Sequence, residues 1–355
     1  MKQKKLLFKK HGPPYLVCIL SILLFIQCGK DDSPNGESSE DQGYLSLPDI
    51  PYDYTSLPSK GVPHSANDVN TVSGNPITND GATLGRVLFY DKKLSKNNTI
   101  SCASCHKQEF AFADNVAKSK GVNGLTIRNS IHLVNIRHFG GAMFWDSRTR
   151  TLEEQTLLPI QDHIEMGSTL PEMLAKLEKT TYYKALFKKA FGDEAITSDR
   201  VSKALAQFIR SLNSYGSKFD RGVPMTPQEQ AGFFKFHEQG ASPPTTFTVS
   251  CMECHQGVQQ VFFVNDSLPI LNFPIEQNGR GFEDEPTFMK VANMKNIELT
   301  APYGHDGRYA TLEILLTHHG NNVSDEDRAN LIAFLKTLTD EEFTKDVRYS
   351  NPFKK

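Results

Sequence analysis

Two short motifs, each with two cysteines and a histidine, are the clearest chemical features of this sequence. Residues 102–106 read CASCH and residues 251–255 read CMECH. In a C-x-x-C-H motif the two thiols are spaced to bond the two vinyl groups of a haem, and the histidine that follows is placed to ligate the iron. One haem would be held by Cys102, Cys105 and His106, and a second by Cys251, Cys254 and His255.

The same residues allow three other interpretations. Two C-x-x-C pairs are spaced for a zinc site, but zinc leaves both histidines unexplained. A thioredoxin-type redox pair needs a βαβ context, which neither motif has. Structural disulfides would not require the histidines. The sequence therefore favours two covalently attached c-type haems.

The N-terminus carries the features of an export signal. Lysines precede an apolar run of about a dozen residues, which is too short to span a membrane, so we expect residues 1–27 to be a signal peptide. Cys28 ends this run and resembles a bacterial lipoprotein processing site, although Gln27 replaces the usual small residue; the alternative is a plain signal peptide with an incidental cysteine. We expect a periplasmic or cell-envelope protein that meets the membrane only through a lipid on Cys28.

Residues 29–43 contain five acidic side chains and no apolar one. Such a stretch cannot offset the entropy of ordering by burying apolar surface. We therefore predict that residues 28–62 form a flexible tether behind the lipidated cysteine.

Charge and cysteine usage exclude several classes of protein. The chain has 355 residues, with 39 basic and 41 acidic side chains and a formal net charge of −2. No basic excess is available to neutralise phosphates, so a nucleic-acid binder is excluded. Of the six cysteines, Cys18 is removed with the signal, Cys28 takes the lipid and four hold haems, so none is left for a disulfide.

The sequence around the haem motifs is duplicated. Residues 146–153 and 306–313 share the pattern D-x-R-x-x-T-L-E, and residues 205–212 match residues 331–338, both with apolar residues at helical spacing. We predict an all-α fold of two cytochrome c-like domains, each with one covalently bound haem. An N-terminal cytochrome c domain would span residues 63–215, a C-terminal cytochrome c domain residues 216–345 and a tail residues 346–355.

Alignment of the two copies on T-L-E predicts how each iron is coordinated. His319 lies eight residues after Thr311, whereas Pro159 lies eight residues after Thr151. Histidine can occupy a sixth coordination position, but proline has no side-chain donor. The second haem should therefore be six-coordinate, with His255 and His319 as ligands, and the first should keep an open face opposite His106. His318 is the competing candidate for the sixth ligand.

From about Leu84 to about Leu338 the sequence resembles the bacterial di-haem cytochrome c peroxidases, including the branch that matures the tryptophan-derived cofactor of methylamine dehydrogenase. The motifs that carry this resemblance are residues 84–91 (LGRVLFYD), 100–106 (ISCASCH), 128–129 (RN), 144–146 (FWD), 165–167 (EMG) and 300–307 (TAPYGHDG). In that family the residue matching His319 is usually methionine or tyrosine. Histidine here implies a lower potential for the second haem.

The resemblance implies roles for two polar residues at the open face of the first haem. Glu165 would take a proton from one peroxide oxygen and return it to the leaving oxygen. Gln155 would orient the peroxide by hydrogen bonding without titrating. His163, two residues from the glutamate, could assist or replace it.

The resemblance also implies that Trp145, the only tryptophan, relays electrons between the haems. A calcium ion between the domains is implied through Asn129 and the backbone carbonyls of Thr300 and Pro302, which are oxygen donors suited to a hard cation.

Many members of this family block the first iron with a histidine in the loop before Arg-Asn. Residues 113–127 contain no histidine, so we expect an enzyme that is open when fully oxidised, unless His132 or His138 moves in.

The function we predict is reduction of hydrogen peroxide to water by a di-haem cytochrome c peroxidase. Electrons would come from a small redox protein, a c-type cytochrome or a cupredoxin, and enter at the second haem. The alternatives are a peroxide-dependent oxidase of a protein side chain or organic substrate, and a non-catalytic di-haem electron-transfer cytochrome. A homodimer is compatible with the sequence.

Overall fold

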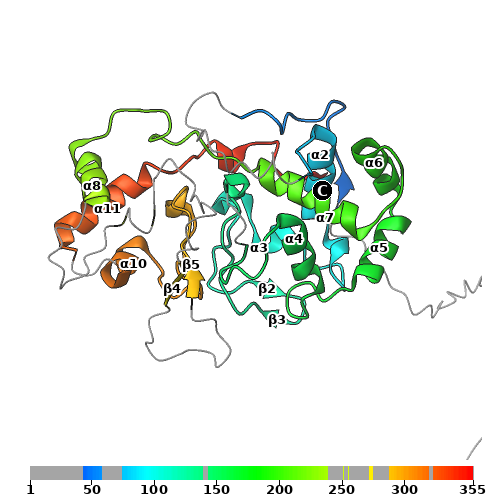
Figure 1. Cartoon of the computed structure of the whole chain (residues 1–355), viewed down its shortest axis with the longest axis horizontal. Helices are drawn as coiled ribbons and strands as arrows, with labels where there is room; N and C mark the ends of the chain where they lie inside the picture. The colour runs from blue at the N-terminus through cyan, green and yellow to red at the C-terminus, as the bar shows by residue number, and fades with distance from the viewer. Residues whose placement is uncertain are drawn as a thin grey trace, which may run out of the picture. The chain divides into compact units, whose positions relative to one another are not determined.

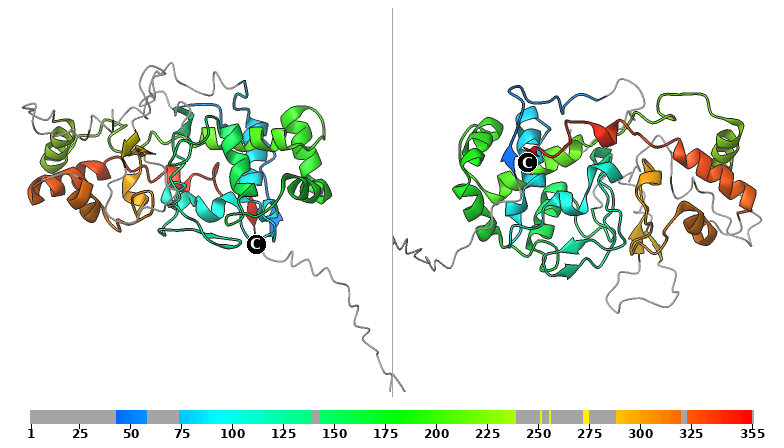
Figure 2. Two further views of the ribbon diagram at one scale, coloured as in Figure 1. Left: turned by 60° about the horizontal axis from the view of Figure 1, so that its bottom comes forward. Right: turned by 180° about the vertical axis from the view of Figure 1, so that it is seen from behind.

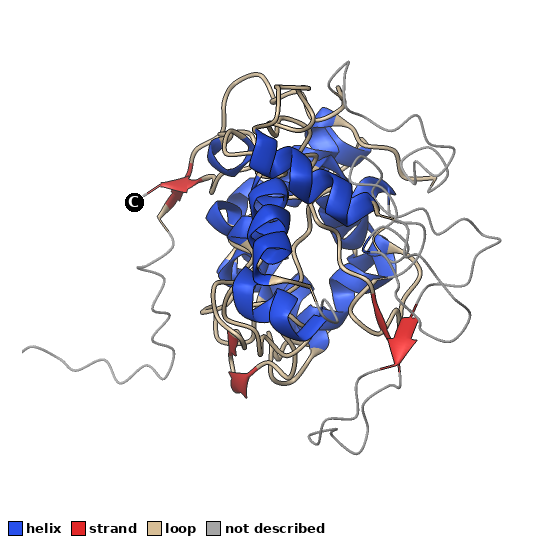
Figure 3. Cartoon of the chain, turned by 90° about the vertical axis from the view of Figure 1, so that its left-hand side faces the viewer, coloured by secondary structure: helices blue, strands red, loops and turns tan. Residues whose placement is uncertain are grey.

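The computed structural model describes residues 43–57, 74–138, 143–238, 251, 255, 272–274, 288–319 and 323–354. The predicted signal peptide, the predicted lipidation site Cys28 and Cys254 of the second haem motif lie outside these residues. Within them helices dominate, and the strands form only two-stranded ladders of two or three residues (Figure 3). In the part of the chain that is described, no helix is long and apolar enough to cross a membrane.

Two helices form the centre of the first hydrophobic core. α2 (Asn79–Tyr90) and α7 (Ser198–Ser211) are buried over most of their length and lie side by side in Figure 1. They approach closely at Gly85, where a Cβ would lie 2.7 Å from the carbonyl carbon of Ala204, so a larger residue would force the helices apart. Among the largest buried side chains of this first core are Phe89, Phe112, Phe187 and Phe208.

The remaining elements around the first core are short. They are η1 (Lys92–Leu94), α3 (Cys102–Cys105), η2 (Gln108–Phe110), β2 (Lys120–Gly121), β3 (Gly124–Leu125), η3 (Ile136–His138), α4 (Leu152–Gln161), α5 (Leu170–Lys179) and α6 (Thr181–Phe191). β2 and β3 pair as an antiparallel hairpin. Long connections between these helices carry most of the polar residues that the sequence singled out.

The second hydrophobic core is smaller and forms between α8 (Pro227–His237) and α11 (Asp325–Lys336), which pack against each other (Figure 1). Its centre is aromatic, because three phenylalanine rings lie 5.5–5.8 Å from the ring of Phe334: Phe219, Phe233 and Phe236. The other elements in this part are β4 (Asn272–Pro274), β5 (Phe288–Lys290), η4 (Ile297–Leu299) and α10 (Leu312–His319). β4 and β5 pair antiparallel.

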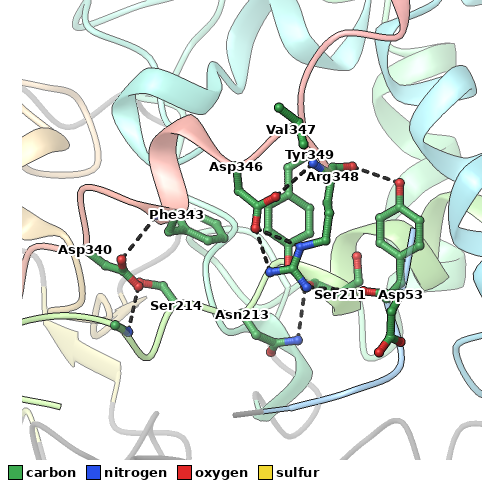
Figure 4. Close-up of polar contacts among 12 residues, drawn as sticks. Asp53, Ser211, Asn213, Ser214, Asp340, Phe343, Asp346, Val347, Arg348 and Tyr349 are labelled. Atoms are coloured by element: carbon green, nitrogen blue, oxygen red, sulfur yellow. Dashed lines mark hydrogen bonds and ion pairs between the residues drawn. The ribbon is translucent and has the colours of Figure 1, made fainter. Parts of the chain in front are cut away.

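The C-terminal segment runs from α11 back to the first core, as the red trace in Figure 2 shows. It contains η5 (Phe343–Lys345) and β6 (Phe353–Lys354), and β6 pairs with β1 (Tyr44–Leu45). Phe343, Tyr349 and Phe353 are buried in the first core. The Tyr349 hydroxyl donates to the carbonyl of Ser211 at 2.8 Å (Figure 4).

Residues 43–57 also pack on the first core, although the sequence assigned them to the tether. Tyr54 is buried, and its hydroxyl donates to the carbonyl of Arg348 at 2.8 Å. The reason is composition: the acidic stretch ends at Gly43, and apolar residues such as Leu45, Leu47 and Tyr52 follow and contact the core.

A buried carboxylate joins the C-terminal segment to the chain between the two cores. Asp340 accepts hydrogen bonds from the Ser214 hydroxyl at 3.1 Å and from the Gly216 backbone N–H at 2.7 Å (Figure 4). Gly216 is required here because a Cβ would lie 2.9 Å from the carboxylate oxygens. This position coincides with the predicted boundary between the two domains.

Candidate functional site

The first haem motif lies on a single helical turn. α3 is capped by Ser101 and Ser104, whose side chains and backbone N–H groups form a capping box. The two thiols are half-buried, and burial raises the pKa of Cys102 to about 12 and that of Cys105 to about 11. Both thiols are therefore neutral at pH 7 and free of any disulfide.

The histidine of this motif is held in one tautomer. His106 Nδ1 lies 2.9 Å from the carbonyl oxygen of Phe112, which can only accept, so Nδ1 carries the proton. The other nitrogen, Nε2, then has a free lone pair for a metal. Burial lowers the pKa of His106, which keeps the ring neutral.

The second motif repeats this arrangement. Cys251 is half-buried and free, and His255 Nδ1 lies 3.2 Å from the carbonyl oxygen of Ala292. Again Nδ1 must donate, so in the neutral ring Nε2 is the nitrogen that carries the lone pair a metal would bind. A c-type haem requires two free thiols to bond its vinyl groups and a histidine nitrogen to ligate its iron, and the described residues of both motifs fit this requirement.

The backbone repeats the internal duplication seen in the sequence. Met143 bridges to Thr149, and Tyr303 bridges to Tyr309, each pair antiparallel. Both turns have residues with positive φ at the same two places, Phe144 and Ser147 in the first, and Gly304 and Gly307 in the second. The turns lead into α4 and α10 at the same offset, so Pro159 and His319 occupy corresponding positions.

The residues at these corresponding positions differ in what they offer a metal. Pro159 lies inside α4 and has no donor atom. His319 is the last residue of α10, and its side chain lies outside the described residues. The competing His318 is exposed, and its ring stacks on Tyr309 with centroids 5.6 Å apart.

Glu165 lies in a loop, residues 162–168, that is fixed by backbone hydrogen bonds to the β2–β3 hairpin. Val122 N donates to the Glu165 carbonyl at 2.9 Å, and Asn123 N donates to the Ile164 carbonyl at 3.2 Å. Gly121 makes this contact possible, because a Cβ there would lie 2.9 Å from the Glu165 Cα. The loop therefore holds the glutamate at a defined place beside the hairpin.

Hydrogen bonds within residues 162–168 also stabilise the loop. Asp162 Oδ1 accepts from the N–H groups of Ile164 at 2.8 Å and Glu165 at 3.0 Å. Gly167 adopts φ +61°, a conformation that favours glycine, and its N–H donates to the Asp162 carbonyl at 2.8 Å.

The carboxyl of Glu165 is half-buried and electrostatically perturbed. Burial, and next the charge of Asp162, raise its pKa to about 7, while Arg148 acts in the opposite direction. The charge of Glu165 in turn helps to raise the pKa of both thiols in the first motif, Cys102 and Cys105. The structure thus brings the glutamate within electrostatic range of the first motif.

Gln155 and His163 lie close to Glu165 in sequence but differ in setting. Gln155 is half-buried on α4, four residues before Pro159 and so on the same face of the helix. His163 is exposed, and its backbone carbonyl accepts a hydrogen bond from Asn123 at 2.7 Å.

Trp145 is connected to the second half of the chain through one residue. Its indole N–H donates to the carbonyl of Asn129 at 2.8 Å, and the backbone N–H of Asn129 donates to the carbonyl of His305 at 2.8 Å. Close packing of Ala117 against Gly307, which has φ +70°, strengthens this contact. The role of Asn129 as a bridge was not predicted, because hydrogen bonds to backbone atoms leave no sequence signal.

The residues predicted to hold calcium lie in two separate segments of the chain. The Asn129 side-chain N–H donates to the Val116 carbonyl at 3.1 Å, and Thr300 follows η4 directly. The Ala301–Pro302 peptide bond is cis. Among the described residues there is no cluster of three or more histidine, cysteine or acidic side chains that could hold a metal ion.

The sequence named His132 and His138 as residues that could move to the first iron. His132 is buried, and its Nε2 lies 3.0 Å from the Asn293 carbonyl. The side chain of His138 lies outside the described residues.

Comparison with known proteins gives consistent relatives. A family model described as "Di-haem cytochrome c peroxidase" matches residues 79–226. The cytochrome c551 peroxidase of Nitrosomonas europaea is 34% identical over 289 residues, which cover 74% of this chain and 81% of that protein. The methylamine utilization protein MauG of Methylophilus methylotrophus is 28% identical over 292 residues, covering 74% and 84%.

Solved structures agree in fold. The crystal structure of a MauG-like protein associated with microbial copper homeostasis superposes with a TM-score of 0.70, at 28% identity, and covers 86% of this chain and 99% of that one. The diheme peroxidase BthA from Burkholderia thailandensis, at 20% identity and a TM-score of 0.60, supports the fold alone. The predicted helical fold class with two c-type haems and the predicted enzyme class are confirmed. The chain belongs to the di-haem cytochrome c peroxidase family.

Proposed function

We propose that this protein reduces hydrogen peroxide to water at a haem held by Cys102, Cys105 and His106, with electrons delivered through a second haem at His255. When bound, the haems supply the iron that binds peroxide and the electrons that reduce it. The observation that carries the proposal is a half-buried glutamate, Glu165, fixed beside the first motif with a pKa of about 7.

Glu165 acts as the proton shuttle. Splitting the O–O bond of peroxide requires that a proton leave one oxygen and arrive on the other, which departs as water. A carboxyl with a pKa near the working pH can accept the first proton and then donate it. Gln155 is neutral at any pH, so it orients the peroxide by hydrogen bonding. The hydrogen bonds that hold residues 162–168 keep the shuttle in place between turnovers.

The two haems divide the work. Because Pro159 has no donor atom, it would not ligate the iron of a haem held by His106, and peroxide would have access to that iron. His319, at the corresponding position of the second copy, would serve with His255 as a ligand of the second haem. Because residues 113–127 lack histidine, we propose that the first haem is open in the fully oxidised protein.

Trp145 would relay electrons between the two haems when both are bound. The support is the short hydrogen-bonded route from its indole N–H to the Asn129 carbonyl, and from the Asn129 N–H to the His305 carbonyl. The donor to the second haem is a small redox protein, either a c-type cytochrome or a cupredoxin.

Further parts of the proposal concern the chain around this centre. The domains divide near residue 216, which is supported by the two separate cores. A calcium ion is held by the Asn129 side-chain oxygen and the carbonyls of Thr300 and Pro302. The protein is exported and anchored by a lipid on Cys28.

The experiment that tests the function compares Glu165→Gln with wild type and with His163→Gln, an exposed neighbour in the same loop. Haem content and ferric spectra are recorded first, then the rate of reaction with peroxide. We expect Glu165→Gln to keep the high-spin signal of the first haem and to lose the reaction, while His163→Gln retains both. A Glu165→Gln protein that reacts at the wild-type rate refutes the shuttle.

A second measurement separates the peroxidase from the alternative function, a peroxide-dependent oxidase of a protein side chain or organic substrate. Peroxide and a reduced cytochrome or cupredoxin are mixed with the enzyme, and consumption of the donor is followed. Steady donor oxidation supports the peroxidase. If peroxide is consumed while the donor stays reduced, the peroxidase assignment fails.

A further inference from the structure

The peptide segment at residues 292–293 contacts both halves of the protein. The carbonyl of Ala292 accepts the Nδ1–H of His255 at 3.2 Å. The next carbonyl, that of Asn293, lies 3.0 Å from Nε2 of His132, and because a carbonyl can only accept, this nitrogen carries a proton and donates. The Asn293 side chain donates in turn to the Val134 carbonyl at 3.3 Å.

These contacts are buried and far apart in sequence. His132 and Asn293 are each 8% exposed. Their hydrogen bond joins residues 161 positions apart, and the bond to Val134 joins residues 159 positions apart. A buried hydrogen bond between distant segments restricts both, because breaking it leaves polar groups without water.

The first haem motif is supported differently. The acceptor for His106 is the carbonyl of Phe112, and this segment is fixed locally, since Phe112 N donates to the Lys107 carbonyl at 2.8 Å and Lys107 N donates to the Ala113 carbonyl at 2.8 Å. The acceptor for His255 instead adjoins a residue that is held from the first half of the chain. The two axial histidines therefore have acceptors of different origin.

We propose that His132 is a positioning residue for the second haem. By its hydrogen bond to Asn293, His132 fixes the neighbouring carbonyl of Ala292, which orients His255. His132, in the first half of the chain, thereby influences the reduction potential of the second haem. The proposal rests on the haem ligation by His255 given above. The hydrogen bond from Nδ1 makes the imidazole a more electron-rich ligand, which stabilises the oxidised iron and lowers its potential. Loosening residue 292 weakens that bond, so the potential rises.

The test uses the holoprotein with both haems and measures the midpoint potential of each by spectroelectrochemical titration. In His132→Leu the potential of the second haem should rise, by an amount equal to a tenfold change in the redox equilibrium, about 59 mV for one electron. The potential of the first haem should stay unchanged. His132→Gln, whose amide can still donate to the Asn293 carbonyl, should restore most of the wild-type value.

The matched control is Leu133→Ala, which removes a side chain of the same burial at the next position and touches neither carbonyl. It should leave both potentials unchanged. An unchanged second-haem potential in His132→Leu overturns the proposal, and so does an equal rise in Leu133→Ala, since that would reflect general loosening.

If His132→Leu does not fold with two haems, Asn293→Ala takes its place, because it removes the bond to Val134 and should raise the same potential; no rise would overturn the proposal. Peroxide reaction of the wild-type protein is recorded in parallel. If the wild-type protein does not react with peroxide, the peroxidase function is refuted, but the measured potentials still test the role of His132.

Discussion

Gly121 offers a sharp test of how Glu165 is positioned. Replacing it by alanine places a Cβ 2.8 Å from the carbonyl carbon of Ile164 and 2.9 Å from the Cα of Glu165, with the Ile164 carbonyl oxygen closer still. Ordinary contacts of this kind are 3.4–4 Å. Either the hairpin or residues 162–168 must then move by roughly 1 Å, and a displacement of that size at a catalytic group costs about 100-fold in rate.

The same movement breaks the two backbone hydrogen bonds from Val122 and Asn123 to this loop. Each contributes about 1 kcal/mol, so we expect a loss of stability of about 2 kcal/mol and a protein that still folds. The rate of peroxide reaction is measured by stopped flow, with haem content and thermal unfolding recorded on the same preparations.

Gly124→Ala serves as the control, because it lies in the same hairpin. Its φ of +133° strains an alanine, but no atom lies within 4 Å of the added Cβ. This variant should lose stability and keep the peroxide rate. A Gly121→Ala protein that carries two haems and reacts with peroxide at the wild-type rate would show that the hairpin does not position Glu165.

Three further outcomes follow from the site. The pKa of Glu165 is raised to about 7, and a general base must be ionised to accept a proton, so the rate of peroxide reaction should rise as the pH increases through 7. In a stopped-flow pH series, Glu165→Gln should react slowly and show no such rise. His319→Ala should turn the second haem high-spin in the ferric spectrum, whereas His318→Ala, which loses only a stack on Tyr309, should leave it low-spin. Trp145→Phe should slow electron transfer between the haems by roughly tenfold, which corresponds to an increase of about 1.4 kcal/mol in the barrier, and should leave the peroxide reaction unchanged. Equal inter-haem transfer rates in the variant and the wild type would exclude a relay through Trp145.

Local patterns predicted a large part of this protein. The C-x-x-C-H motifs indicated the haems because the three residues that hold each haem are consecutive or nearly so in the sequence. The repeated D-x-R-x-x-T-L-E pattern predicted the correspondence of Pro159 and His319, and the structure has matching bridges and turns at both copies. Helices such as α7 follow from apolar periodicity and an N-cap threonine.

Contacts between distant loops could not be predicted. The bonds between residues 122–123 and 164–165 join backbone atoms, which every residue type possesses. The bond from the His132 side chain also ends on a backbone atom, the Asn293 carbonyl, so the sequence does not indicate its partner. From the sequence, His132 was only a loop histidine that could move to an iron. The packing of Tyr349 in the first core was equally hidden, since an aromatic residue near the end of a chain carries no information about its partner.

The return of the C-terminal segment has a consequence for the order of assembly. The first core takes Phe343, Tyr349 and Phe353 from the segment after α11, so it cannot close until the chain has been synthesised as far as these residues. During that interval the turn carrying Cys102 and Cys105 lacks part of its surroundings. Until the core closes, the two thiols that the finished fold half buries are therefore more accessible for haem attachment.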